Sequence, residues 1–458
     1  MSAGSHSQDA QGTDPERPEH VAPWDRAAII AIAVGVAARA VVLVLHPPVD
    51  FVYSDMAGYV TRAQHLATGG PQGRLDAFFP SGTHVVLAIP LFIFGSGRSG
   101  LWAASILWFV LGSLSPWLAW RWARRILPVQ AAALTASFIS LWPLFITQVG
   151  FFLSEVPALT FLLGALLLAA RFRDDDAPPA VPMLAAFGLV VGTGFAVRPQ
   201  LALNDAVAVL PVVLTLWKQG VGRRVALLAA LLLGLIVPVG VVATLNTDAA
   251  NHPVLISENT GVNFFLAQCD GGAVYVYGPH TNYRLVSPVY VQDHKGRLYV
   301  FKDHDIWDQG FFVGQAFDCV RSDGVRHLRV IGRHILDLTV TSVPWPQVDD
   351  PGMRGVVRAT NVGYSVLLPT VLVASGFVFW RRRPENRGPR LVLAHLLCVL
   401  PTVIFFVSEP RYRIPYDAFG LALVAALAAR ALAARRGART PEPGKRRSRR
   451  AVGNGSAR

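Results

Sequence analysis

Charged residues are scarce in this chain. Only 16% of its 458 residues are charged and 52% are hydrophobic, whereas a soluble globular protein carries about 25% charged residues. The mean hydropathy is +0.41. Too little charge is present to cover a soluble surface of ordinary composition, so we expect much of the surface to face lipid.

The sequence also lacks a secretory signal peptide. Its first 25 residues are polar, contain proline and carry charges of both signs, unlike the basic and then apolar pattern of such a peptide. The first apolar run begins near Ala27 and is expected to act as an uncleaved anchor. The tails, residues 1–26 and 435–458, are rich in Pro, Gly, Ser and charge. Such composition predicts disorder, and we expect both tails in the cytoplasm.

Apolar runs dominate the chain, and no internal repeat is present. Runs long enough to cross a bilayer, each of about 20 residues, lie near 27–46, 100–120, 128–147, 155–172, 181–197, 200–217, 225–245, 357–380, 389–408 and 413–434. They predict an all-α polytopic membrane protein with about ten transmembrane helices. Seven of these helices lie in residues 27–245 and three in 357–434. The apolar segment 85–94 is too short to cross, so we expect it to lie in the outer interface or to pack re-entrantly.

Basic residues mark the ends of the apolar runs, and they account for much of the net charge of +13. Cytoplasmic loops carry an excess of Lys and Arg, and anionic lipid headgroups attract them. With a cytoplasmic N-terminus, all of the clusters fall inside, while the loops 47–99, 148–154, 246–356 and 409–413 fall outside. This distribution argues against nucleic acid as a partner. The clustered residues are Arg121, Arg124, Arg125, Arg171, Arg173, Lys218, Arg223, Arg224, Arg381, Arg382 and Arg383, and the tail adds more from Arg435 to Arg450.

The long loop 246–356 has the composition of a small folded domain. Its segments YVYGPH and GRLYVF are strand-like and its later part is helical in pattern, which predicts a mixed α/β extracytoplasmic domain. Cys269 and Cys319 both lie in this loop, whereas Cys398 lies within an apolar run. An outside location permits a disulfide between the first two, and two free thiols are the alternative.

Two carboxylates stand where outer loops meet helices. Asp55 begins a helical pattern in the first outer loop, where it is followed by Tyr59. From the spacing alone, an ordinary N-cap explains an Asp at such a place better than chemistry does. Glu155, in FFLSEVPAL, stands at the mouth of an apolar run. The helix dipole favours it there, but a carboxylate at the edge of the hydrocarbon is costly unless it faces the bundle interior or a cavity.

Arginines are expected on the same outer side. Arg198 lies between two runs, and SEPRYRIPYD places Arg411 and Arg413 just before the last one. Outer arginines run against the usual charge bias, and a phosphate ligand would explain them because a guanidinium binds phosphate through two hydrogen bonds. Carboxylates beside arginines suit the activation of a hydroxyl, with a carboxylate accepting its proton and arginines neutralising a departing phosphate.

The order of these segments over most of residues 27–430 resembles the GT-C glycosyltransferases of the protein-mannosyltransferase and aminoarabinose-transferase type. The segments that carry the resemblance are SDMAGY, FFPSGTHVVLAIPLFIFG, AWRWARRILPVQAAALTA, FFLSEVPALTFLLGALLL, ISENTGVNFFLAQ and EPRYRIPY. Where the family has a double proline in the second segment, this chain has Pro80-Ser81. The resemblance implies a polytopic enzyme that uses a polyprenyl-phosphate sugar as donor.

The resemblance also implies roles for individual residues. Asp55 would be the catalytic base, and Asp50 or Glu155 would supply the second carboxylate that many members carry next to the first. His84 would contact donor phosphate or sugar, although a lone His at a helix start is as readily structural. Arg198 and Arg411 would contact phosphate. The remaining substrate-binding positions are Tyr59, Asn263, Glu409 and Tyr412.

Three classes of function are therefore compared. The favoured class is a plasma-membrane glycosyltransferase that moves a mannose- or arabinose-type sugar to an extracytoplasmic glycan, glycolipid or protein hydroxyl. No His-rich metal signature is present, and no metal or other cofactor is expected. A transporter or lipid flippase is the main alternative. Transporters commonly contain pseudo-repeats with polar groups at mid-membrane, whereas this sequence has no internal repeat and its candidate polar residues are expected outside. The third class is a non-catalytic assembly or receptor protein.

Overall fold

The computed structural model describes residues 23–50, 52, 55–70, 72–174, 179–269, 290–292, 298–300, 307–322, 324–340, 353–381, 386–405 and 410–439. Most of the two tails for which disorder was predicted lies outside the described residues. Helix α1 begins at Pro23, four residues before the predicted first run. Helix α17 continues to Arg439, five residues beyond the predicted last run.

Within these described residues, seven helices are long and apolar enough to cross a membrane. They cover Pro23–Leu45 (α1), Arg98–Ile126 (α4), Glu155–Phe172 within α7 (Glu155–Asp174), Pro199–Leu216 (η3, Pro199–Leu201, with α9, Ala202–Leu216), Val221–Ala250 (α10), Arg354–Trp380 (α14) and Pro410–Arg435 (η6, Pro410–Arg413, with most of α17, Ile414–Arg439). The chain is thus a multi-pass membrane protein, as expected.

The predicted total of ten membrane-crossing helices is not confirmed. Run 128–147 is divided into α5 (Val129–Leu141) and the segment Pro143–Gly150, which contains α6 (Pro143–Thr147) and η2 (Gln148–Gly150) and is bent by 54° from α5. Counting this bent pair as one span raises the number to eight. Run 181–197 forms the shorter helix α8 (Val181–Val197), and run 389–408 holds α15 (Arg387–Leu397) and α16 (Leu400–Phe405). Proline explains the bend, because it lacks a backbone N–H and favours the first turn of a new helix.

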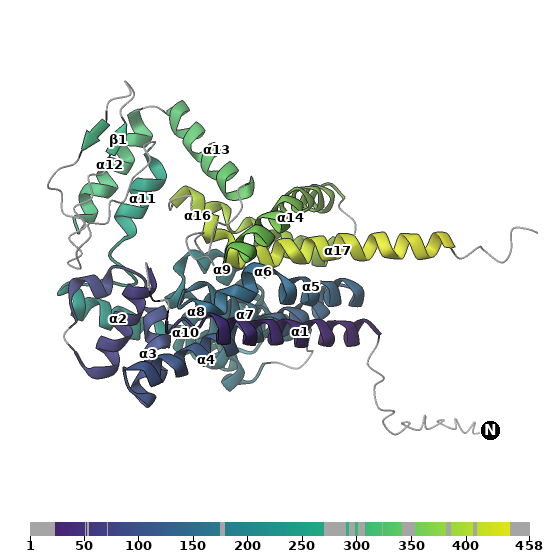
Figure 1. Cartoon of the computed structure of the whole chain (residues 1–458), viewed down its shortest axis with the longest axis horizontal. Helices are drawn as coiled ribbons and strands as arrows, with labels where there is room; N and C mark the ends of the chain where they lie inside the picture. Colours follow the sequence, from purple (N-terminus) through teal and green to yellow (C-terminus); the bar gives the residue numbers. More distant parts are fainter. Residues whose placement is uncertain are drawn as a thin grey trace, which may run out of the picture.

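The helices form a bundle with two distinct ends (Figure 1). The start of α1 and the end of α17 lie at one end, and α2 (Asp55–Thr68) and α3 (Gly82–Phe94) lie at the other. The later loop helices α11 (Thr260–Gln268), α12 (Gln309–Ser322) and α13 (Gly324–Val340) also lie at this second end, which we call the loop end. The polar loops predicted to share one side of the membrane therefore share one end of the bundle.

Aromatic packing joins the two large loops. Phe78 of the first loop meets Trp307 of the second edge-on, with ring centroids 5.5 Å apart. Arg74, in η1 (Arg74–Ala77), donates to both carboxylate oxygens of Glu258 at 2.8 and 3.1 Å. Its guanidinium carbon also lies 4.8 Å from the centre of the Trp307 ring. The loop end is therefore one packed structure rather than separate loops.

The mixed α/β character predicted for the long loop is not confirmed. Its described part consists mainly of helices, with one antiparallel pair of three-residue strands, β1 (Tyr290–Gln292) and β2 (Leu298–Val300). The predicted strand YVYGPH lies outside the described residues, and GRLYVF contains β2. Helices α11 and α12 pack together through Phe265 and Phe312, whose ring centroids are 5.7 Å apart.

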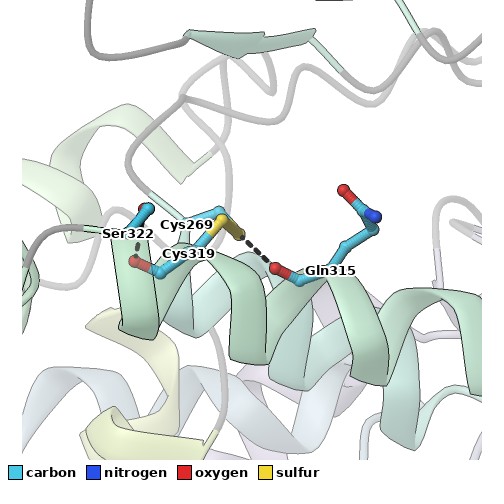
Figure 2. The surroundings of a disulfide bond; sticks show 4 residues. All are labelled: Cys269, Gln315, Cys319 and Ser322. Atoms are coloured by element: carbon cyan, nitrogen blue, oxygen red, sulfur yellow. Dashed lines mark hydrogen bonds between the residues drawn. A yellow bond between two sulfur atoms is a disulfide. The ribbon is translucent and has the colours of Figure 1, made fainter.

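A disulfide joins these two helices. Cys269, the residue that follows α11, is bonded to Cys319 of α12 across a sequence separation of 50 residues. Figure 2 shows the bond beside the backbone of α12, with the Cys269 sulfur 3.8 Å from the carbonyl oxygen of Gln315. Of the two alternatives that the sequence left open, the structure has the bonded one. Cys398 is free and buried.

The disulfide predicts a definite alkylation pattern. Denatured, unreduced protein is expected to take up one alkyl group, at Cys398, and reduction before alkylation is expected to raise the number to three. Closing a loop of this length stabilises the folded state by about 4 kcal/mol in the chain-entropy model, so Cys319→Ser should lower the unfolding midpoint. Mass spectrometry of the alkylated peptides is the check, and uptake of three groups without reductant would exclude the bond.

Glycines allow α8 and α10 to approach closely. Gly188 and Gly192 are four residues apart on α8 and face the backbone of α10, while Gly234 of α10 faces the carbonyl oxygen of Ala185. A Cβ at any of these glycines would overlap backbone atoms of the opposite helix. Small residues at this spacing are a common solution in membranes, where helices gain stability from close van der Waals contact.

We expect Gly234→Val to disrupt this helix pair. The added side chain would meet backbone that cannot move aside, and overpacking of this kind typically costs about 1–3 kcal/mol. Gly240→Val is the matched control, because Gly240 lies on the same helix with no atom within 4 Å of an added Cβ. Thermal unfolding in detergent, followed by tryptophan fluorescence, should show a lower midpoint for Gly234→Val only. Equal midpoints for the two variants would contradict the close approach.

Candidate functional site

Asp55 and Arg411 meet at the loop end although they lie far apart in the chain. Asp55 is the first residue of α2, and Arg411 lies in η6, immediately before α17. A guanidinium nitrogen of Arg411 lies 2.6 Å from a carboxylate oxygen of Asp55, and the side chains are 18% and 14% exposed. This is the geometry of a charge-assisted hydrogen bond, and it leaves both groups partly accessible.

Glu155 and Arg198 form a second and more deeply buried pair. Their closest nitrogen and oxygen atoms are 2.9 Å apart, and each side chain is only 4% exposed. The same guanidinium donates to the hydroxyl of Ser154 at 3.0 Å. Pro199 disfavours helical geometry in the residue before it, so α8 ends at Val197 and Arg198 adopts an extended backbone conformation, with φ −149° and ψ 86°. This break places the Arg198 side chain opposite the first residue of α7.

Two tyrosines connect the pairs. The ring of Tyr412 lies between the arginines, with its centre 5.6 Å from the guanidinium carbon of Arg198 and 6.0 Å from that of Arg411. Tyr59 is buried close to all four charges: burial raises the pKa of its phenol to about 12, the two carboxylates add to this rise, and the two guanidiniums oppose it. The phenol therefore stays protonated at neutral pH. One cluster results, called the charged quartet, and it consists of Asp55, Glu155, Arg198 and Arg411.

Six of the predicted site residues thus come together, and two other described ones, His84 and Asn263, do not. His84 is buried in α3, where burial and then the nearby charge of Arg62 lower the pKa of its ring to about 3, so it is neutral at physiological pH. Asn263 lies in α11, and its backbone N–H donates to the carbonyl of Asn259. Glu409 lies outside the described residues. Of the two candidates for the second carboxylate, Glu155 belongs to the quartet.

Asp50, the other candidate, lies elsewhere on the surface. A carboxylate oxygen of this exposed residue is 2.8 Å from a guanidinium nitrogen of Arg98, at the start of α4. Arg39, in the first apolar run, is buried, and it donates to the carbonyl oxygens of Gly35 at 3.0 Å and Ser140 at 2.9 Å. A charged residue within a membrane helix either faces the bundle interior or extends to the interface, and Arg39 does the former.

Arg413 has a different environment from Arg411. It is buried, donates to Asp417 at 3.0 Å, and also donates to the carbonyl oxygen of Leu338 in α13. The hydroxyl of Tyr364, in α14, donates to the same Asp417 carboxylate. Sequence reasoning had grouped Arg413 with the outer arginines; the spacing of four residues to Asp417 was the available signal for an internal pair. Arg413 thus anchors the segment that carries Arg411.

A small cavity adjoins the quartet. It is lined by Glu155 and by residues of several helices, among them Arg39, Ser115 and Gln148. Both amide atoms of the buried Gln148 lack a hydrogen-bond partner among the described residues. Within the same described part of the chain, no group of three or more His, Cys, Asp or Glu side chains is arranged to hold a metal ion.

The burial of the second pair predicts a large effect of breaking it. Glu155→Gln would leave the guanidinium of Arg198 buried without its counter-charge, and such a change typically costs about 3–5 kcal/mol. Asp50→Asn, which removes an exposed pair, should cost less than about 1 kcal/mol. Unfolding midpoints of the two variants in detergent give the comparison. An equal shift would show that Glu155 and Arg198 are not a buried pair.

Comparison with known proteins yields one family and several solved structures. Residues 81–243 match the family described as "Dolichyl-phosphate-mannose-protein mannosyltransferase". No curated protein matches the chain. The chain spans about half the length of the oligosaccharyltransferases that it matches.

Three solved structures align with most of the chain at low sequence identity. The oligosaccharyltransferase AglB from Archaeoglobus fulgidus, in complex with an inhibitory peptide and a dolichol-phosphate, is 12% identical with a TM-score of 0.41, and the match covers 90% of this chain and 51% of that one. The A. fulgidus oligosaccharyltransferase tethered to an acceptor peptide is 11% identical with a TM-score of 0.43, covering 90% and 50%. ArnT from Cupriavidus metallidurans, bound to undecaprenyl phosphate, is 15% identical with a TM-score of 0.38, covering 91% and 81%.

The family match falls on the segment that contains the interfacial helix, the basic turn and the Glu155–Arg198 pair. These features carried part of the resemblance drawn from the sequence. The family match therefore supports, over residues 81–243, the resemblance to glycosyltransferases of the protein-mannosyltransferase type.

Proposed function

We propose that this protein is a membrane glycosyltransferase that moves a sugar from a polyprenyl-phosphate donor to a hydroxyl of an extracytoplasmic acceptor. The observation that carries the proposal is the charged quartet, in which two carboxylates and two arginines meet at the loop end. The family match over residues 81–243 supports the same reading, since the family is described by a dolichyl-phosphate-mannose donor.

The two pairs have different tasks in this proposal. The Asp55–Arg411 pair is partly exposed, so an acceptor hydroxyl can reach the Asp55 carboxylate. The Glu155–Arg198 pair is almost fully buried, and this pair holds Arg198 in a fixed position beside Tyr412. Preorganised charges lower a barrier because they need no rearrangement at the moment of reaction.

The reaction follows from this arrangement. The acceptor oxygen attacks the anomeric carbon of the donor sugar and forms the new glycosidic bond, while its proton passes to Asp55. The bond between the anomeric carbon and the phosphate oxygen breaks, and its electron pair leaves with the polyprenyl phosphate. Arg411 and Arg198 neutralise the departing phosphate. Tyr59 stays protonated and is able to donate a hydrogen bond to the same groups.

Finer assignments belong to the same proposal. The sugar is of mannose or arabinose type, and the acceptor is a cell-wall glycan, a glycolipid or a protein hydroxyl. His84, Asn263, Glu409 and Tyr412 bind substrate. Ten membrane crossings in the plasma membrane, with the loop end outside, agree with the basic residues at the other ends of the helices, among them Arg124 and Arg125 in the last turn of α4.

The proposal predicts loss of sugar transfer in Asp55→Asn. Removal of a general base typically lowers the rate by about 10²- to 10⁴-fold, and Asp50→Asn is the matched control because it changes a carboxylate in the same loop that pairs with Arg98 instead. The purified chain, in proteoliposomes with radiolabelled polyprenyl-phosphate sugars and a membrane extract as acceptor, is assayed for label transferred and polyprenyl phosphate released.

Two outcomes would contradict the proposal. Transfer that survives in Asp55→Asn, with an unchanged unfolding midpoint, would remove Asp55 as the base. Labelled solute that crosses proteoliposomes without any transfer product would favour the transporter class instead.

A further inference from the structure

Helix α13 has two chemically different faces. Val330 and Leu338 are buried, at 6% and 1% exposure, and they face the rest of the protein. Along the other side, four apolar side chains are 58–69% exposed: Val325, Leu328, Leu336 and Val340. Positions 328, 332, 336 and 340 follow one another at intervals of four residues, with Val325 three residues before Leu328, so these side chains lie along one side of the helix. This set is called the α13 stripe.

The position of α13 relates the stripe to the membrane surface. Figure 1 shows α13 at the loop end, inclined to the long helices α14 and α17 instead of continuing their direction. Its last turn is attached to the bundle, because the carbonyl oxygen of Leu338 accepts a hydrogen bond from Arg413. Both α14 and the segment 410–435 are candidate membrane spans. The last turn of α13, which carries the end of the stripe, therefore lies beside the loop-end start of the second of these spans.

Charges accompany the stripe. Arg329 is exposed beside Leu328, and the Arg333 side chain is 76% exposed, with Asp337 as a distant partner at 4.0 Å. An apolar stripe bordered by arginines is the composition of a helix that lies in the membrane interface, where apolar groups enter the acyl region and the long arginine side chains reach the headgroups. A water-exposed helix gains nothing from four uncovered aliphatic side chains.

We propose that the α13 stripe binds the outer leaflet, with its aliphatic side chains among the acyl chains and Arg329 and Arg333 on anionic phospholipid headgroups. Val362 and Val366 of α14, a candidate membrane span, are likewise exposed. The charge of the arginines suits an anionic surface. The inference concerns a surface outside the charged quartet, and it rests on the proposed function only in taking the loop end to lie outside.

This contact would orient the whole loop end. Helix α13 packs against α11, α12 and α16, so lipid held by the stripe fixes the disulfide-linked helices relative to the bilayer. The same helix meets Arg413, which is two residues beyond Arg411 in η6. The segment that carries one arginine of the quartet is thereby attached to an element resting on the membrane surface.

Site-specific fluorescence tests the contact. Leu328→Cys and Leu336→Cys are labelled separately with an environment-sensitive dye. Asp337→Cys is the matched control, because position 337 lies on the face of the helix opposite Leu328. The native cysteines do not interfere, because Cys269 and Cys319 are bonded and Cys398 is buried. The labelled full-length proteins are placed in phosphatidylcholine vesicles with a minor fraction of phosphatidylglycerol, with or without nitroxide-bearing lipid.

The expected result is quenching several-fold stronger at positions 328 and 336 than at 337, with blue-shifted emission at the first two. Adding Arg329→Gln and Arg333→Gln should abolish the increase in quenching that phosphatidylglycerol gives over phosphatidylcholine alone. Equal lipid quenching at the three positions, or quenching of 328 and 336 by aqueous iodide only, would overturn the proposal. Protection from iodide that appears only when a protein acceptor is added would overturn it too, since the stripe would then bind protein.

Discussion

The loop end depends on one electrostatic constraint: a charge removed from water must have a partner of opposite charge close by. Glu155 and Arg198 are both nearly inaccessible and lie 2.9 Å apart. Neither charge could be buried at its position without the other. The pair therefore fixes the start of α7 relative to the break between α8 and η3. Arg198 then meets the Tyr412 ring, which places η6 against the same point. Chain segments far apart in sequence are thus arranged by a single buried pair.

The same requirement for a partner of opposite charge applies to a second buried pair nearby. Arg413 and Asp417 are buried together, and the carboxylate is shared with Tyr364 of α14 while the guanidinium is shared with the backbone of α13. This pair joins α13, α14 and α17 at the base of η6. Arg411 therefore projects toward Asp55 from a short segment fixed by internal contacts at both Arg413 and Tyr412. Local rigidity at η6 follows from pairing rather than from regular structure.

Much of this arrangement was predictable because it follows from hydropathy and sidedness. Continuous apolar runs predicted α1, α4 and α10, and most of the predicted ends lie within a few residues of the observed ones. The loops that were assigned to one side of the membrane contain or adjoin Asp55, Glu155, Arg198 and Arg411, and the helices of these loops lie at one end of the bundle. The bend near Pro143 was not predictable, since a proline serves equally to start a helix or to interrupt one.

Which charged residues pair with each other could not be predicted from the sequence, for a different reason. Sidedness gives the level of a residue along the membrane normal but not its position within the membrane plane. Nothing in the spacing therefore says that Asp55 meets Arg411 while Asp50 meets Arg98. Arg413 is different, because its spacing of four residues to Asp417 was a signal in the sequence that would have separated it from Arg411.

The charge of the quartet adds a final consideration. Two carboxylates and two guanidiniums sum to zero, so the resting site has no net charge to attract a phosphate strongly. In the proposed reaction the acceptor proton neutralises Asp55, and the quartet acquires one net positive charge. That charge appears as the bond to phosphate breaks and negative charge builds on the leaving group. Because Asp55 contacts Arg411 directly, its protonation releases the guanidinium for the phosphate at the same moment. Proton transfer and departure of the phosphate would then favour each other through one ion pair.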